Sequence, residues 1–208
     1  HLVVDLTIKE FLDKTAGSDP VPGGGSIAAL NAAIAASLAE MVANLTVGKK
    51  KYEDKESLMK EVIQTANHYQ GGFIKDIDAD SDAYNEVFAA FKLPKETDEE
   101  KTKRSEAIQV ATKVAAEVPM SVARKAFTIM ETVEVVAEHG NQNAVTDACV
   151  SMMTARTAVL AAILNVKINL SSIKDEAYVA KMQSECAQLE RDAIAKEQAL
   201  LKKVNEIL

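Results

Sequence analysis

An alanine-rich run from Ile27 to Val47 constrains the fold of this chain more than any other feature. The helix that it predicts carries small residues on more than one face, at Ala28, Ala32, Ala35, Ala36, Ala39 and Ala43. A helix that is small and apolar nearly all round must be surrounded by neighbours or lie in a subunit interface. A membrane span is disfavoured, because Asn31, Glu40 and Asn44 interrupt the run and alanine is only weakly hydrophobic. We therefore expect a buried central helix.

The rest of the chain also follows a helical pattern, because no window alternates with period two over a useful length. Thr7–Glu10 and Thr97–Glu100 are capping boxes that open helices, and Pro119 is expected to break or restart the second one. Further helices are predicted over about 53–91, 119–139, 141–166 and 175–208, with a loop over 169–172. The predicted fold class is all-α, a single domain over residues 1–208 built as a bundle of about six to eight helices.

Composition agrees with closely packed helices and excludes several functions. Of the 208 residues 48% are apolar but only 4% are aromatic, so the core must consist of small and aliphatic side chains. The formal charge of −7 argues against nucleic acid or an anionic membrane as the main partner. Cys149 and Cys186 lie far apart, and His1, His68 and His139 form no cluster. We therefore expect no metal site and a reduced, cytoplasmic protein without a signal peptide.

The stretch Pro22-Gly23-Gly24-Gly25-Ser26 is the first candidate binding element. Consecutive glycines offer bare backbone that a ligand can approach closely, and they are unfavourable inside a helix. Ser26 is predicted to be the N-cap of the alanine helix, whose free N–H groups form an anion site. The stretch lacks the Gly-Lys-Ser/Thr of a phosphate-binding loop, and no strand precedes it as in a dinucleotide fold. From the pattern alone, a tight turn and a ligand cradle remain equally good interpretations.

Aspartates at every second position from Asp76 to Asp82 form a candidate catalytic group. On a helix, Asp80 shares one face with Asp76 and Tyr84, whereas Asp78 and Asp82 lie on the opposite side. Partial burial of one such carboxylate raises its pKa towards neutrality and suits it to general acid or base catalysis. The same pattern is typical of a solvated acidic face, which the spacing alone favours. A carboxylate pair without a third ligand gives poor support for Mg²⁺ or Ca²⁺.

Amide side chains at both ends of one predicted helix form another candidate site. Asn141 begins this element together with Asp147, and Asn165 and Asn169 stand near its far end. Buried asparagines cost free energy unless they are paired, so a group of them can bind a ligand with an amide-rich edge, such as a pterin. They can equally cap helices and tie loops together.

The triplet Lys49-Lys50-Lys51 follows the alanine helix. Lysines at this position can offset the negative end of the helix dipole. In a chain this acidic they can also attract a polyanionic ligand tail.

Several motifs occur together in the order seen in one family. They are Pro22-Gly23-Gly24-Gly25-Ser26, Met41–Thr46 with Gly48-Lys49-Lys50, Asp78-Ala79-Asp80 with Ala83-Tyr84, Lys92–Lys95, Val118-Pro119, Gly140-Asn141 with Asp147, and Asn165–Leu170. Over nearly its whole length the chain resembles the formiminotetrahydrofolate cyclodeaminase and methenyltetrahydrofolate cyclohydrolase family. That family comprises the C-terminal half of formimidoyltransferase-cyclodeaminase and stand-alone bacterial proteins. Several motifs in one order are far more specific than any one of them.

The resemblance implies an all-helical homodimer with a folate site between helices. The implied residues are Asp80 and Asp147 for catalysis, and Gly23, Gly24, Gly25, Ser26, Lys49, Lys50, Tyr84, Asn141, Asn165 and Asn169 for substrate binding. Among them Gly23–Ser26 form the substrate cradle, and Lys49 and Lys50 bind the glutamate tail of a folate that carries one or more glutamates. The implied chemistry requires no metal and no cofactor beyond tetrahydrofolate as the one-carbon carrier.

Two reactions at one carbon atom fit the resemblance. We expect first a cyclodeaminase, which converts 5-formiminotetrahydrofolate to 5,10-methenyltetrahydrofolate and ammonia. The alternative is a methenyltetrahydrofolate cyclohydrolase, which hydrolyses the 5,10-methenyl form to 10-formyltetrahydrofolate. A second alternative is a non-catalytic folate-binding or scaffold protein that keeps the family fold.

Overall fold

The computed structural model describes residues 2–208, and the regular secondary structure of that region is entirely helical. The α-helices are α1 (Ile8–Ala16), α2 (Gly24–Asn44), α3 (Glu56–Phe91), α4 (Asp98–His139), α5 (Val145–Leu170) and α6 (Glu176–Asn205). Short 3-10 turns are η1 (Val3–Asp5), η2 (Lys50–Lys55) and η3 (Gln142–Ala144). The prediction of an all-α bundle with six to eight helices is confirmed. His1 lies outside the described residues.

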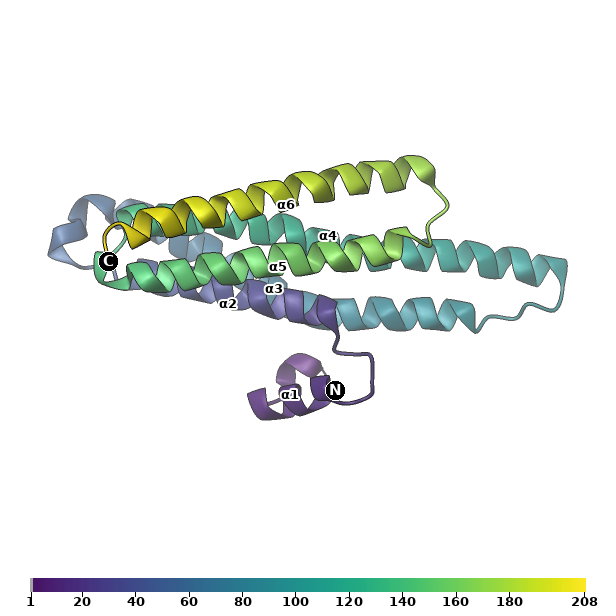
Figure 1. Ribbon diagram of the computed structural model, residues 1–208. Coiled ribbons are helices and arrows are strands. Elements are labelled where there is room, and N and C mark those ends of the chain that lie inside the picture. Colours follow the sequence, from purple (N-terminus) through teal and green to yellow (C-terminus); the bar gives the residue numbers. More distant parts are fainter. Residues whose placement is uncertain (1) are drawn as a thin grey trace.

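The helices α2, α3, α4 and α5 form an up-and-down four-helix core, and α6 lies against α4 and α5 (Figure 1). The alanines of α2 let three helices approach closely, and all six of the alanines predicted for its core are fully buried. Ile34 of the same helix is nevertheless 44% exposed, so this chain leaves one face of its central helix uncovered. The paired helices α3 and α4 are longer than α2 and extend beyond it at one end of the bundle (Figure 1).

Two segments, Gly24–Asn44 and Gln142–Leu170, are long and apolar enough to cross a membrane by those criteria alone. About half of each is buried within this chain, at 56% and 50% of the apolar window. A core helix of a soluble protein passes the same test. The burial of the alanines therefore agrees with the expected role of α2 as a core helix.

Local signals set several helix ends as predicted. Thr7 and Thr97 each accept a hydrogen bond from the backbone N–H of the glutamate three residues later, and each glutamate returns a bond to the cap residue. The α4 helix ends at His139 with Gly140 as its cap, as expected. Asp175 caps α6 through the N–H of Tyr178. These ends depend on side chains within one turn, which is why the sequence reveals them.

Three predicted boundaries are wrong. The α2 helix begins at Gly24 with Gly23 as its N-cap, so Ser26 lies inside the first turn and is not the cap. The α4 helix runs through Pro119 without interruption. A proline in a helix leaves the carbonyl four residues earlier without its N–H partner. Here the side-chain amide of Asn169 donates to that carbonyl, Ala115 O, at 3.1 Å, and Asn169 itself belongs to α5, not to a loop.

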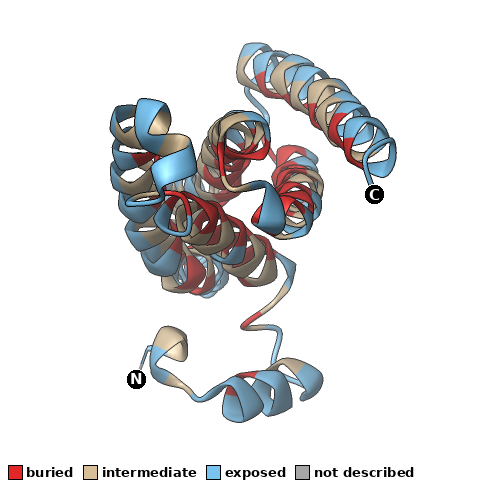
Figure 2. Cartoon of the chain, turned by 90° about the vertical axis from the view of Figure 1, so that its left-hand side faces the viewer, coloured by how far each residue is buried: buried red, intermediate tan, exposed pale blue. Residues whose placement is uncertain are grey.

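Residues 2–23 form an N-terminal arm that lies apart from the bundle around α1 (Figures 1 and 2). Asp78 of α3 holds its start, because its carboxylate accepts hydrogen bonds from the backbone N–H groups of Val3 and Val4. Phe11 is the buried residue of α1, whereas Ile8 is 82% exposed. The arm then leads directly into the glycine stretch and α2.

Candidate functional site

A cavity of about 330 Å³ lies where the N-terminus of α2 meets α3, α4 and α5. It is lined by Pro20, Val21, Gly23, Gly24, Gly25, Asp80, Tyr84, Val87, Ala115, Asn165, Ile168 and Asn169. Seven of these residues belong to the predicted site, although the sequence spreads them over 147 positions from Gly23 to Asn169. The fold therefore brings the glycine stretch, one aspartate, the tyrosine and two asparagines together.

Asp80 packs directly onto the backbone of the glycine stretch. A β-carbon at position 25 would overlap the Asp80 carboxylate, so only glycine allows the carboxylate to lie there. Burial raises the pKa of the Asp80 carboxyl to about 6, and a backbone hydrogen bond from Ser26 opposes the rise. Asp80 can therefore hold or release a proton near neutral pH, whichever the ligand requires.

Ser26 acts from behind the cavity and not as part of its lining. Its hydroxyl is buried and donates to the carbonyl of Ile77 at 2.7 Å, and it lies 3.3 Å from the hydroxyl of Ser81. These contacts join the first turn of α2 to α3 on both sides of Asp80. Ser26 is thus a positioning residue, which corrects its predicted role as a helix cap.

Asn165 and Asn169 keep their side-chain oxygens free, since within residues 2–208 neither oxygen accepts a hydrogen bond. The side-chain amide of Asn165 donates to Ala161 O at 2.8 Å, and that of Asn169 donates to Ala115 O and to Asn165 O. Asn165 also lies against Gly24, where an added β-carbon would come within 3.3 Å of its amide nitrogen. The N–H groups of the first α2 turn supply donors at the same place.

The remaining lining residues were missed by the sequence prediction. Val87 and Ile168 lie three residues after Tyr84 and Asn165, so helical spacing places them on the same faces. Ala115 stands four residues before Pro119, and no local signal marked it as part of a site. Pro20 and Val21 belong to the arm, to which the sequence analysis assigned no role in the site.

The other predicted residues lie at the opposite end of α2. Lys49, Lys50 and Asn141 line a separate recess of about 380 Å³, and Asp147 lies in the first turn of α5 at that end. Since α2 has 21 residues, the two ends are roughly 30 Å apart. Within one chain the structure therefore does not bring these residues to the Asp80 cavity.

Asn141 is used to tie the lysine end together. Its side-chain amide donates to Leu45 O at 2.9 Å, and its side-chain oxygen accepts from Asn143 N at 3.0 Å. Its own backbone N–H donates to the hydroxyl of Thr46. Within this chain Asn141 therefore joins the end of α2 to the turn before α5, and its predicted role in substrate binding stays a prediction.

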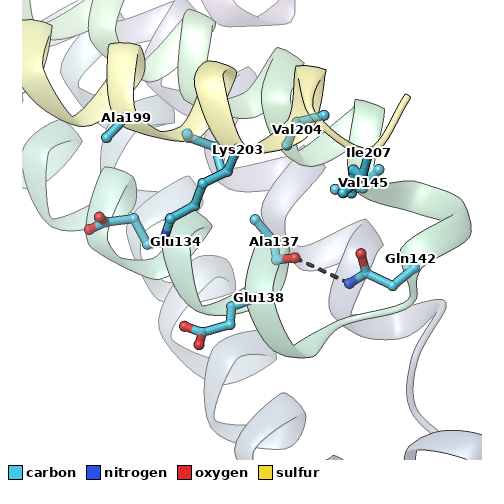
Figure 3. Close-up of a pocket in the computed structure, with 10 residues that line it drawn as sticks. Glu134, Ala137, Glu138, Gln142, Val145, Ala199, Lys203, Val204 and Ile207 are labelled. Carbon is cyan, nitrogen blue, oxygen red and sulfur yellow. Dashed lines mark hydrogen bonds between the residues drawn. The ribbon is translucent and has the colours of Figure 1, made fainter.

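A further cavity of about 210 Å³ lies between the ends of α4 and α6 and the start of α5 (Figure 3). Gln142 closes one side through a hydrogen bond of 3.2 Å to Ala137 O. Glu134, on another side, is paired with Lys196 at 2.7 Å. This cavity contains none of the predicted site residues. In residues 2–208, no three His, Cys, Asp or Glu side chains are grouped so that they could hold a metal ion.

Residues 7–188 match the family described as Formiminotransferase-cyclodeaminase. The chain is 39% identical over 187 residues to the methenyltetrahydrofolate cyclohydrolase of Methylorubrum extorquens, which covers 90% of each chain. It is 35% identical to the formimidoyltransferase-cyclodeaminase of Gallus gallus, over 90% of this chain but 34% of that protein. The chain thus spans about a third of the length of this fused relative. The crystal structure of formiminotetrahydrofolate cyclodeaminase from Thermotoga maritima superposes with a TM-score of 0.88, at 32% identity, over 99% of this chain and 98% of that one.

Proposed function

The chain belongs to the formiminotransferase-cyclodeaminase family of folate one-carbon enzymes, and we propose that it is a cyclodeaminase whose acid–base group is Asp80. The observation that carries this proposal is the Asp80 carboxyl itself. It lies on bare glycine backbone inside a cavity, and its pKa is raised to about 6. A group that titrates close to neutral pH can both accept and return a proton within one catalytic cycle.

The polar groups of the cavity match the edge of a pterin ring. The side-chain oxygens of Asn165 and Asn169 can accept from the ring N3–H and the 2-amino group. The N–H groups of the first α2 turn can donate to the 4-oxo group. Tyr84 is 45% exposed at the rim, where it can contact the ring that follows the pterin.

The proposed reaction balances with Asp80 as the only proton carrier. N10 of 5-formiminotetrahydrofolate, protonated on its formimino group, attacks the formimino carbon and forms a C–N bond. The Asp80 carboxylate takes the proton of N10 and passes it to the amino group of the tetrahedral carbon. Ammonia then leaves as the C–N bond to it breaks, and the electron pair of N5 completes the 5,10-methenyl cation. Asp80 is again a carboxylate at the end.

The cellular setting completes the proposal. No resident cofactor is needed, because the one-carbon carrier is the substrate. The free and buried thiols of Cys149 and Cys186 suit a reducing compartment, so we place the enzyme in the cytoplasm.

The uncovered face of α2 suits a homodimer. The lysines at positions 49–51 suit a folate with a glutamate tail of one or more residues.

Methenyltetrahydrofolate cyclohydrolase is the second candidate, and one observation favours it. The relative of that name is 39% identical and matches over 90% of both chains, whereas the fused relative from Gallus gallus is matched over 34% of its own length. In that reaction the Asp80 carboxylate takes a proton from water as the oxygen adds to the methenyl carbon. It returns the proton to N5 as the C–N5 bond breaks, and the hydroxyl group gives its remaining proton to solvent as it becomes the formyl carbonyl, which leaves 10-formyltetrahydrofolate and one released proton. A purely structural role leaves the raised pKa of Asp80 without a use.

The deciding experiment follows the near-ultraviolet absorbance of the methenyl chromophore. Purified protein is added to 5-formiminotetrahydrofolate, and ammonia is measured in the same sample. A rise in absorbance with one ammonia per methenyl group identifies the cyclodeaminase. With no rise, the protein is added to 5,10-methenyltetrahydrofolate, where accelerated decay identifies the cyclohydrolase. Silence with both substrates contradicts the proposal.

A further inference from the structure

The cavity between the ends of α4 and α6 has a charged side and an apolar side (Figure 3). We call it the α4–α6 cavity. It lies at the lysine end of the bundle, whereas the Asp80 cavity lies at the opposite end, the cavity end. Its charged lining residues are Glu134, Glu138 and Lys203, which Figure 3 shows on one side, away from Val145 and Ile207. A ligand that fits must therefore carry its charges at one end and an apolar group at the other.

Small side chains leave the space for this cavity. Protein interiors are close-packed, and voids larger than a water molecule are few. Ala137 of α4 and Ala199 of α6 line the gap between the two helices, where larger side chains could have filled it. A cavity of about 150 Å³ holds a benzene molecule. The 210 Å³ available here thus suffices for a short aliphatic chain with a small charged head.

Glu138 is the carboxylate of this cavity without a Lys or Arg partner. Glu134 binds the ammonium group of Lys196 at 2.7 Å. In residues 2–208 no Lys or Arg nitrogen lies within 4.0 Å of the Glu138 carboxylate, and the imidazole of His139 is 3.7 Å away, beyond hydrogen-bond distance. Glu138 also stands in the last turn of α4, where the negative end of the helix dipole repels a carboxylate. An ammonium group bound there is attracted both by Glu138 and by the helix end.

Lys203 supplies the opposite charge on the same side of the cavity. No carboxylate in the described part of the chain lies within 4.0 Å of its ammonium group, although two glutamates line the same cavity. Figure 3 shows its side chain extended from α6 towards α4. The cavity therefore offers one cation and one carboxylate that do not neutralise each other. A zwitterion can satisfy both through charge-assisted hydrogen bonds.

Gln142 closes the cavity from the turn that precedes α5. Its side-chain amide donates to Ala137 O at 3.2 Å and to Gly140 O at 3.1 Å. These bonds fix the side chain beside the cavity (Figure 3). Over residues 2–208 its side-chain oxygen accepts no hydrogen bond, so it is a further acceptor for an ammonium group.

The same lining excludes other classes of ligand. A phosphate or another polyanion would meet two carboxylates and a single lysine, so repulsion disfavours it. A metal ion lacks ligands, because residues 2–208 hold no group of three suitable side chains. A purely apolar molecule would leave the charges of Glu138 and Lys203 unused. An amino acid with its charges at opposite ends of a long chain would place one of them against the apolar wall. The remaining class has both charges on one carbon atom.

We propose that the α4–α6 cavity binds an α-amino acid with a branched aliphatic side chain. Glu138 binds the ammonium group, and Lys203 binds the carboxylate. The aliphatic side chain packs against the apolar residues Val145, Leu200 and Val204. The site shares no lining residue with the Asp80 cavity, so this inference does not rest on the proposed function.

Ligand-observed NMR tests the site on the full chain, with L-leucine as the probe. Saturation transfer to the leucine methyl groups should give a dissociation constant of roughly 0.1–10 mM, which is typical for so few contacting atoms. Isopentylamine lacks the carboxylate and isovalerate lacks the ammonium group, so each should bind at least about tenfold more weakly. The absence of saturable leucine binding overturns the proposal, and so does an amine that binds as tightly as leucine.

Ala199→Leu fills the cavity and should abolish leucine binding, because the new side chain takes the space of the ligand. Ala195→Leu is the matched control. It changes an exposed residue one turn earlier on α6 that does not line the cavity, and it should bind leucine as wild type does. Thermal unfolding checks that both variants are folded. A folded Ala199→Leu variant that still binds leucine overturns the proposal.

Lys203→Ala separates the two charges of the probe. It should weaken leucine binding at least about tenfold and leave the binding of isopentylamine unchanged, whereas Glu138→Gln should weaken both. Lys202→Ala changes the neighbouring residue, which does not line the cavity, and should have no effect. All three residues are exposed, so these variants keep the fold even if the Ala199 variant does not. Unchanged leucine binding in Lys203→Ala overturns the proposal.

Asp80→Asn distinguishes this inference from the proposed function. The variant should bind leucine as wild type does, because Asp80 lies at the other end of the bundle. Folate turnover by a wild-type protein that does not bind leucine would reject this inference alone. Leucine binding by a protein that is inactive on both folate substrates would reject the proposed function alone.

Discussion

The two ends of the bundle use the same kinds of side chain in different ways. At the lysine end the side chain of Asn141 both donates to Leu45 O and accepts from Asn143 N, so both its nitrogen and its oxygen hold the fold together. At the cavity end, Asn165 and Asn169 donate to backbone carbonyls, while their side-chain oxygens accept no hydrogen bond within residues 2–208. Asn141 therefore serves only the fold within this chain, whereas Asn165 and Asn169 stabilise the fold and also leave an acceptor free for a ligand. A polar residue indicates a binding site when the fold leaves part of its hydrogen-bonding capacity unused.

The largest expected difference between the ends is catalytic. Asp80→Asn removes the proton carrier, and we expect turnover to fall by roughly 10²–10⁴-fold while folate binding remains measurable. Asp82→Asn, an exposed neighbour on the same helix, serves as the control and should keep wild-type turnover. Steady-state kinetics with parallel binding titrations provide the measurement. A rate near wild type in Asp80→Asn would remove this end of the bundle from the chemistry.

Gly25→Ala should have the next largest effect. The new β-carbon overlaps the Asp80 carboxylate, which must move away from the helix terminus, and a displacement of about 1 Å can cost on the order of 10²-fold in rate. Gly71→Ala is the matched control, because a β-carbon there meets nothing within 4 Å. It should leave the rate unchanged and stabilise α3 by about 0.5–1 kcal/mol. Equal kinetics for both variants would mean that Asp80 does not depend on the bare backbone.

The pH dependence of kcat/KM should follow the carboxylate at the cavity end. Both candidate reactions begin with Asp80 ionised, so kcat/KM should fall about tenfold for each pH unit below a pKa of about 6. The residual activity of Asp80→Asn should lack this limb. A wild-type profile that stays flat down to pH 5 would assign the proton transfer to another group.

Asn169→Leu should lower the stability of the fold in addition to weakening binding. It leaves Ala115 O without a partner beside Pro119, which costs about 1–3 kcal/mol. Pro119→Ala restores a backbone N–H for the same carbonyl. The double variant should therefore be more stable than the sum of the two single changes predicts, by about 1 kcal/mol in urea unfolding. Strict additivity would show that the asparagine does not compensate for the proline.

The smallest expected effects are on the free energy of unfolding, which one substitution at each end should change in opposite directions. The folded-state pKa of Asp80 is raised, so the folded protein binds the proton more tightly and stability falls as pH rises from about 4 to about 6. Asp80→Asn should consequently stabilise the protein at pH 7.5 by about 1–2 kcal/mol, and not at pH 4. Thr46→Val, at the lysine end, removes the acceptor of Asn141 N and should destabilise by about 1 kcal/mol at both pH values. Thermal unfolding of both variants at the two pH values measures these changes in stability. A loss of stability in Asp80→Asn at pH 7.5 would contradict the predicted difference between the two ends.

Much of the fold could be predicted because the deciding contacts are local. The capping boxes at Thr7 and Thr97, the end at His139 and the cap at Asp175 each depend on residues within one turn. The errors at Ser26 and Pro119 have a different origin. Glycines form the first turn of α2 because a carboxylate more than 50 positions away requires the space. Pro119 stays inside its helix because Asn169, 50 positions later, replaces the missing donor.

The site was predictable only through combined motifs. Nothing in the spacing of Asp80, Gly25 and Asn165 relates them, since they meet only when α2, α3 and α5 pack together. The family resemblance predicted the site residues, and the structure then showed that they lie at two opposite ends of α2. Ile168 and Val87 followed from helical periodicity but were overlooked, whereas Ala115 had no signal at all.

The N-terminal arm, fixed by the two hydrogen bonds to Asp78, gives the cavity one wall that is less stable than the others. Pro20 and Val21 belong to an arm in which only Phe11 and Pro22 are buried, so it can open without unfolding the bundle. Amide hydrogens of residues 8–25 should then exchange with solvent far faster than those of α5, although both segments touch the same ligand. A bound folate would join the arm to the bundle and slow this exchange, so the occupancy of the site can be followed from the arm alone.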